Sequence, residues 1–266
     1  MLNIIVLIKW VPRVDQMKFD PVKKTLIRVG VESQINPPDL NAIELGLQLK
    51  EKYGGKVIVL SMGPPPAKEG LEIAIGMGAD EAILLTDKAL AGSDTLATSY
   101  ALHKAIERIG KYDIIIAGEE TTDSSTGQVG PGVATFLDIA QVTYVDEVLE
   151  IDVGKRIGVF RRSVDDGFEI VEADLPVLIT VGVGINTPRG ITLSGKLRAK
   201  KAGVIQLWNI ERAGIRKECA GFLGSPTTVA KVETVEPPKR RREIINAAPE
   251  EAAKWIIEKM KEIGIL

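Results

Sequence analysis

Four short apolar runs alternate with segments of helical periodicity over the first half of the sequence. The runs, rich in β-branched residues, lie at 4–8, 57–60, 82–85 and 114–117. A short, wholly apolar run is typical of a strand that is buried on both faces, as in a parallel sheet. A helical segment follows each run, and this alternation implies right-handed crossovers. The sequence therefore predicts an α/β fold built on a doubly wound, mainly parallel sheet.

Beyond residue 142 the pattern changes to short β-rich runs that are separated by turns. These runs lie at 145–151, 156–162, 168–171 and 177–183. They can form hairpins that add antiparallel strands to the sheet. Residues 184–203 have no periodicity and are expected to form a long exposed loop. We expect one α/β domain over residues 1–235 and a linker with a helical arm over residues 236–266, whose apolar stripe requires a partner surface.

Local signals place several boundaries in the first half. Residues 17–31 are expected to form a polar hairpin that turns at Asp20-Pro21. The first long helix is expected to begin at Asn36-Pro37. Asparagine is a favoured N-cap residue, and proline suits the first helical position that follows it. Either Ser93 or Asp94 can cap a later helix.

Net charge and rare residue types exclude several classes of function. The net charge of −2 gives no basic field for nucleic acid. The single Cys219 and the single His103 exclude a Cys/His zinc site and a cysteine-ligated iron–sulfur cluster. We expect no metal and no catalytic acid–base residue. The N-terminus lacks a basic signal region, and no apolar stretch reaches the roughly 20 residues of a membrane span, so we expect a cytoplasmic protein.

The loop after the fourth apolar run is the candidate binding site. In open α/β sheets, ligands bind outside the carboxyl ends of the strands. Backbone N–H groups at a helix start, with nearby hydroxyls, suit a phosphate or a ribose. Asp123 suits a ribose hydroxyl or the fixing of the loop, because a carboxylate repels phosphate. The candidates are Asp123, Ser124, Ser125, Thr126, Gly127, Gln128, Val129, Gly130 and Pro131.

An ordinary loop whose hydroxyls merely cap the next helix is the alternative interpretation. The first apolar run is not followed by Gly-x-Gly-x-x-Gly, and the sequence has no Walker-type Gly-Lys-Ser/Thr. A standard Rossmann dinucleotide site or a P-loop is therefore not expected.

Several ordered segments together resemble the β-subunit of electron-transfer flavoproteins. They include Asn36-Pro37, Ser61-Met62-Gly63-Pro64, the loop from Asp123 to Pro131, the stretch from Arg162 through Asp165-Asp166-Gly167 to Thr180, Thr192-Leu193, and Lys261-Glu262-Ile263-Gly264. The resemblance covers nearly the whole chain. It implies a Rossmann-like, adenine-nucleotide-binding domain with a C-terminal arm that embraces an α-subunit.

The resemblance also implies an electron carrier that works as an αβ heterodimer. One FAD lies mostly in the α-subunit, and the β-subunit of the common type holds AMP. In the bifurcating type, and in the similar FixABCX type, a second FAD in the β-subunit accepts electrons from NADH. The segment from Gly92 to Ser99 resembles this second type, and its helix start and hydroxyls suit the extra phosphate of a dinucleotide. A mere helix cap at Ser93 or Asp94 is the alternative.

We therefore expect FAD in this chain, with AMP as the alternative and a non-redox, ATP-binding regulatory module as a further alternative. NADH is the expected electron donor. The implied nucleotide contacts outside the loop are Leu7, Lys9, Asn36, Asp39, Met62, Gly63, Asp94, Thr95 and Thr98.

The segment 184–203 corresponds to the family's docking loop for acyl-CoA dehydrogenases and related redox partners. Leu193 aligns with its leucine anchor, and Arg189 and Arg198 would steer the encounter. Ser194 and Gly195 depart from the usual sequence, so a FixC/FixX-like quinone reductase with a ferredoxin-like subunit can replace the flavin dehydrogenase. Membrane contact would then be made only through that partner. The alternative is that Leu193 folds back onto the domain.

Overall fold

The computed structural model describes residues 1–13, 18–20, 25–27, 32–228 and 243–266. The chain forms two compact units, residues 1–230 and 231–266, each of which is described by itself. The predicted domain boundary at 235/236 and the first residues of the predicted linker lie outside the described residues, and the boundary stays a prediction.

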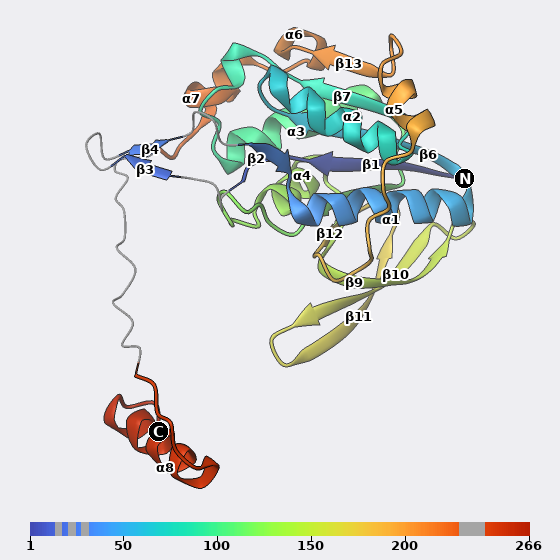
Figure 1. The fold of residues 1–266 in the computed structure, drawn as a ribbon. Coiled ribbons are helices and arrows are strands. Elements are labelled where there is room, and N and C mark those ends of the chain that lie inside the picture. Colours follow the sequence, from blue (N-terminus) through green and yellow to red (C-terminus); the bar gives the residue numbers. More distant parts are fainter. Residues whose placement is uncertain (14–17, 21–24, 28–31, 229–242) are drawn as a thin grey trace. The chain divides into compact units, whose positions relative to one another are not determined.

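A nine-stranded sheet organises the first unit, in the order β11-β10-β9-β12-β8-β1-β6-β7-β13 (Figure 1). Its strands are β1 Leu2–Ile8, β6 Gly55–Met62, β7 Glu81–Leu85, β8 Ile114–Gly118, β9 Ala140–Asp152, β10 Ile157–Val164, β11 Gly167–Asp174, β12 Val177–Val181 and β13 Ile205–Trp208. In this order, each pair of neighbouring strands from β9 to β13 is parallel. Pairing between β9, β10 and β11 is antiparallel. The predicted mainly parallel sheet with added antiparallel strands is confirmed.

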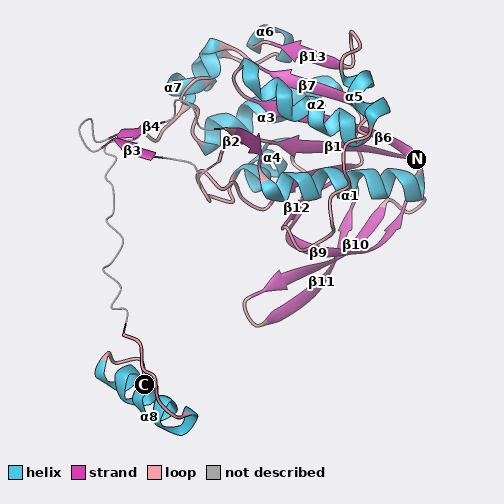
Figure 2. Ribbon diagram, in the orientation of Figure 1, coloured by secondary structure: helices cyan, strands magenta, loops and turns pink. Residues whose placement is uncertain are grey.

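Helices cover both faces of the sheet (Figure 2). The α-helices are α1 Pro37–Tyr53, α2 Lys68–Met77, α3 Thr95–Ile109, α4 Val129–Leu137, α5 Leu193–Ala199, α6 Ile210–Ala213, α7 Gly221–Gly224 and α8 Pro249–Glu262, and short 3-10 helices lie at Pro65–Ala67, Lys88–Leu90 and Lys217–Cys219. Ile4 and Val6 of β1 join the core beneath α1 and α2, whereas Ile5 and Leu7 join the core beneath α3 and α4. Burial of alternate residues on opposite faces explains why the central strands are continuous apolar runs.

Two small antiparallel pairs lie outside the main sheet. Strand β2 (Trp10–Pro12) pairs with β5 (Ser33–Ile35), and β3 (Lys18–Asp20) pairs with β4 (Thr25–Ile27). The second pair confirms the predicted hairpin, although its turn lies outside the described residues.

The prediction of an irregular loop over residues 184–203 is wrong for its second half, which contains α5. The Thr192 hydroxyl caps this helix by accepting a hydrogen bond from Gly195 N at 3.0 Å. A Cβ at position 195 would collide with the Gly76 carbonyl of α2, so glycine permits the close approach of the two helices. A helix of two turns is too short to produce a periodic apolar pattern, which is why the sequence did not reveal it.

Candidate functional site

Several chain segments meet at the carboxyl ends of β1, β6 and β8. Lys9 follows β1, Met62 ends β6 and is followed by Gly63, and the loop 119–128 connects β8 to the start of α4. The structure brings the candidates Lys9, Asn36, Asp39 and Asp123 together at this edge. This convergence is what a parallel sheet provides, because its strands all end on the same side.

Asn36 is the centre of a buried hydrogen-bond network at the site. It is 0% exposed, and its Nδ2 donates to Asp39 Oδ1 at 3.0 Å and to the Glu120 carbonyl at 2.8 Å. Its Oδ1 accepts from Thr122 N at 3.1 Å. The expectation that the Asn36 side chain caps α1 is wrong, since it makes no capping bond. Asn36 instead ties the start of α1 to the loop after β8.

Asp39 completes this network from within the first turn of α1. Its Oδ2 accepts a hydrogen bond from Lys9 N at 2.7 Å. Burial raises the pKa of Asp39 to about 7, although hydrogen bonds from Asn36, Lys9 N and Gly118 N act in the opposite direction. A Cβ at position 118 would collide with the Asp39 carboxylate. Asn36 and Asp39 are thus enclosed in the protein and hold the site's loops in place.

The Asp39 pKa predicts a pH dependence of stability. The carboxyl group of Asp39 has a pKa of about 7 in the folded protein, against an ordinary value of 3.8. At a pH between these two values, Asp39 is therefore protonated in the folded protein and ionised in the unfolded chain. Stability therefore falls as pH rises through this window, by about 1.4 kcal/mol per pH unit for this one group. Urea unfolding at pH 5, 6 and 7 measures the slope. The Asp39→Asn variant should lack this part of the slope, and equal slopes in the two proteins would contradict the assignment.

Lys9 and Asp123 form an ion pair across the site. Lys9 Nζ lies 2.7 Å from Asp123 Oδ1 and 3.5 Å from Thr121 Oγ1. Partial burial acts to raise the pKa of Asp123, but hydrogen bonds from Lys9 and Thr121 and the Lys9 charge prevail and lower it. Of the two roles considered for Asp123, the geometry supports fixing the loop to β1.

Backbone N–H groups without an intrachain partner lie where the loop leads into α4. The structure gives no intrachain hydrogen bond to the N–H groups of residues 126–130, all of which are described. Gly127 has a φ of +63°, a left-handed conformation that favours glycine. A Cβ at Gly130 would lie 2.8 Å from Thr180 Cγ2 of β12, so this glycine is required for packing. The Ser124 hydroxyl is hydrogen-bonded to the Thr121 hydroxyl at 2.9 Å, and the Ser125 hydroxyl donates to the Thr121 carbonyl at 3.3 Å.

The starts of α3 and α4 are linked to each other. Thr95 Oγ1 donates to Gln128 Oε1 at 2.9 Å, so the positive ends of two helix dipoles lie next to each other. Asp94 caps α3 by accepting from Ala97 N at 3.0 Å, and its other oxygen accepts from Thr227 Oγ1 at 2.8 Å. Between the two caps offered by the sequence, the structure selects Asp94, because the Ser93 hydroxyl donates to the Leu90 carbonyl.

Other candidates lie near this edge without polar side-chain contacts. Leu7 is buried in the core below α3 and α4, Val129 packs against the same core, and Thr98 is half-buried on α3. Pro131 lies in the first turn of α4. Thr121, Ser225 and Thr227 were missed by sequence reasoning. The last two are more than 90 residues from Gln128, and no local pattern connects them to α3.

The three proposed docking residues have different surroundings. Leu193 begins α5 and is 77% exposed, so the interpretation that it folds back onto the domain is wrong. The Arg189 guanidinium binds Glu44 at 2.8 Å and Glu51 at 2.5 Å on α1. The Arg198 guanidinium donates to the carbonyls of Ala79 and Ile75. Both arginines hold residues 189–198 against the domain.

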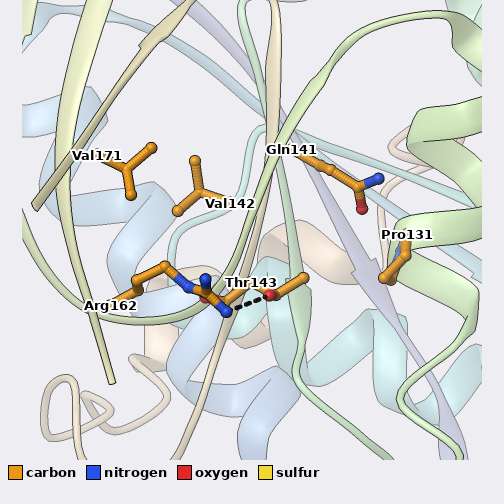
Figure 3. Close-up of a pocket in the computed structure, with 6 residues that line it drawn as sticks. All are labelled: Pro131, Gln141, Val142, Thr143, Arg162 and Val171. Atoms are coloured by element: carbon orange, nitrogen blue, oxygen red, sulfur yellow. Dashed lines mark hydrogen bonds between the residues drawn. The ribbon is translucent and has the colours of Figure 1, made fainter. Parts of the chain in front are cut away.

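Two hollows of about 340 Å³ lie away from the strand-end crevice. One is lined by Pro131, Gln141, Val142, Thr143, Arg162 and Val171, and only Pro131 connects it with the candidate site (Figure 3). The other is lined by Tyr100, His103, Lys104, Phe136, Gly214 and Arg216. Among the described residues, no cluster of His, Cys, Asp or Glu side chains could hold a metal ion, and no helix is long and apolar enough to cross a membrane.

Comparison with known proteins agrees with this geometry. The family model for the electron transfer flavoprotein domain matches residues 23–209. The electron transfer flavoprotein subunit beta of Clostridium acetobutylicum is 45% identical over 261 residues, which is 98% of each chain. Protein FixA of Sinorhizobium fredii is 44% identical over 90% of this chain and 86% of its own. Subunit CarD of the caffeyl-CoA reductase-Etf complex of Acetobacterium woodii is 38% identical over the full length of both. The chain therefore belongs to the electron transfer flavoprotein β-subunit family.

Proposed function

We propose that this chain pairs with an electron-transfer flavoprotein α-subunit and binds FAD at the carboxyl edge of its sheet, accepting electrons from NADH. The observation that carries the choice of a dinucleotide is the Thr95–Gln128 hydrogen bond of 2.9 Å. It places the starts of α3 and α4 side by side, so that each helix start can bind one of the two phosphates of a diphosphate. AMP has one phosphate and would need only one of them.

The residues present fit such a ligand. The N–H groups of residues 126–130 have no intrachain partner and can donate to phosphate oxygens. Bound FAD would supply the two-electron chemistry with NADH. The chain's own part is to bind and orient: Asn36, Asp39 and the Lys9–Asp123 pair hold the loop that carries the donors.

The relatives support a place in a larger electron-transfer complex. CarD is a subunit of an Etf complex with caffeyl-CoA reductase, and other relatives are FixA proteins. We infer that electrons pass to a flavin dehydrogenase or to a quinone reductase with a ferredoxin-like subunit, by bifurcation. Helix α8 exposes Ile256 and Ile257, and Ile263 is exposed directly after the helix ends. Such an apolar stripe suits the α-subunit.

Flavin content tests the proposal. Two flavins per purified αβ pair are expected, whereas one flavin with released AMP would contradict FAD in this subunit. The Thr95→Ala variant should bind FAD about tenfold more weakly, a loss of about 1.4 kcal/mol, and AMP with unchanged affinity. Thr135→Ala is the matched control, since Thr135 lies exposed towards the far end of α4 and its hydroxyl donates to the Pro131 carbonyl within the same helix. Equal FAD binding by wild type and Thr95→Ala would remove the role of the second helix start.

A further inference from the structure

Glu119 lies at the carboxyl edge of the sheet, directly after β8. Its N–H donates to the Val181 carbonyl of the neighbouring strand β12 at 2.9 Å, which fixes its backbone beside the end of that strand. The side chain is half-buried. A Cβ at Gly182 would lie 2.8 Å and 2.9 Å from the two carboxylate oxygens of Glu119. The carboxylate therefore lies over the end of β12, and glycine at position 182 leaves room for it.

The carboxylate of Glu119 differs from the other two half-buried or buried carboxylates at this edge. Asp39 accepts a hydrogen bond from Lys9 N at 2.7 Å, and Asp123 binds Lys9 Nζ at 2.7 Å. Among the described residues, the Glu119 carboxylate has no hydrogen-bond donor and no ion-pair partner. Burial raises the pKa of Glu119, and the charge of Glu120 acts in the same direction. The carboxylate has thus lost part of its water without gaining a donor from the protein.

Glu119 is also close to the backbone donors of the loop. A Cβ at Gly127 would lie 3.4 Å from the Glu119 carbonyl oxygen, so Glu119 is a neighbour of the N–H groups of residues 126–130. In an adenine nucleotide the ribose is joined directly to the phosphate, and its hydroxyls are hydrogen-bond donors close to that phosphate. Dinucleotide-binding sheets use a carboxylate to bind such hydroxyls. Asp123 is occupied by Lys9, which leaves Glu119 for this role.

We propose that Glu119 accepts a hydrogen bond from a ribose hydroxyl of the bound adenine nucleotide and thereby favours nucleotides that carry these hydroxyls. A metal ion is not the ligand we infer, because no group of three or more His, Cys, Asp or Glu among the described residues could hold one. The inference rests on the proposed nucleotide site. It applies to FAD and to AMP alike, since both contain an adenosine ribose.

Binding of ADP and of 2′,3′-dideoxy-ADP, which lacks the ribose hydroxyls, tests this contact in the full-length chain freed of bound nucleotide. The wild-type chain should bind ADP about tenfold more tightly than the analogue, because a hydrogen bond to a charged acceptor is a strong one. The Glu119→Met variant should bind the two nucleotides with equal affinity. Any change in phosphate repulsion affects both nucleotides alike, so their ratio reports the hydroxyl contact. The melting temperature should not fall, since the carboxylate has no partner in the protein to lose.

Glu120→Met is the matched control. Glu120 is the next residue along the chain and carries the same charge, but its side chain is exposed. Its backbone carbonyl, which binds Asn36 at 2.8 Å, is retained in the variant. This variant should therefore prefer ADP over the analogue as strongly as the wild-type chain does.

The possible results separate this inference from the proposed function. Equal binding of ADP and the analogue by the wild-type chain would overturn the ribose contact alone. So would a Glu119→Met protein that still prefers ADP tenfold. Loss of the preference in Glu120→Met as well would assign it to the charge of the loop and overturn the role of Glu119. A wild-type chain that binds neither ADP nor FAD would overturn the proposed nucleotide site together with this inference.

Discussion

The Asn36→Ala variant is expected to lose about 3 kcal/mol of stability and most of its nucleotide affinity. Asn36 is fully buried, and its amide joins Asp39, the Glu120 carbonyl and Thr122 N. Its removal leaves buried polar groups without partners, and each such group costs about 1–3 kcal/mol. The loop that carries the proposed phosphate donors also loses its connection to α1. Urea unfolding and the nucleotide content of the purified protein measure the two effects.

Asn41→Ala is the matched control for this variant. Asn41 is also a buried asparagine of α1, and its Nδ2 binds the carbonyls of Val183 and Asn186. It contacts the segment after β12 and makes no bond to the loop at 120–122. Similar loss of stability with retained nucleotide is therefore expected. If the two variants lose nucleotide equally, general destabilisation explains the effect and the special role of Asn36 is wrong.

The parallel core could be predicted from sequence because its physical causes are local. Burial on both faces makes each central strand a continuous apolar run. Gly54 and Gly78 end α1 and α2 at positive φ angles of 70° and 134°, conformations that glycine adopts without strain. Strand β12 could be identified as a strand but not placed. It pairs with β8 and β9 on its two sides, and this order depends on the path of the whole chain.

The roles of individual site residues were less predictable, because they depend on partners far away in sequence. The sequence suggested Asn36 as a helix cap, since Pro37 follows it. In the structure its side-chain amide donates to the Glu120 carbonyl and accepts from Thr122 N, both more than 80 residues away. Asp94 was recognisable as a cap, but its bond to Thr227 was not. Local patterns thus indicated that these residues converge at the strand ends, as the structure shows, but could not distinguish residues that would line a site there from residues that hold its loops.

The Leu193→Ala variant is expected to slow electron delivery to the redox partner about 30-fold while leaving the protein folded. Leu193 is 77% exposed at the start of α5, and Leu197, one turn later, is also exposed. Truncation of a central apolar anchor typically costs about 2 kcal/mol of binding free energy. Lys196 and Lys200 lie exposed beside it and can take the steering role, since Arg189 and Arg198 bind the domain itself.

Steady-state turnover with the partner, flavin content and melting temperature together test this anchor. The value of kcat/KM for the partner should fall in Leu193→Ala, whereas flavin content, NADH reduction and melting temperature should equal those of wild type. Leu207→Ala provides the comparison, because Leu207 is an exposed leucine on β13 outside residues 184–203. The exposed position of Leu193 allows this separation, since a side chain in water contributes little to folding. A Leu193→Ala protein with a lowered melting temperature and unchanged partner turnover would show that Leu193 stabilises the fold and docks nothing.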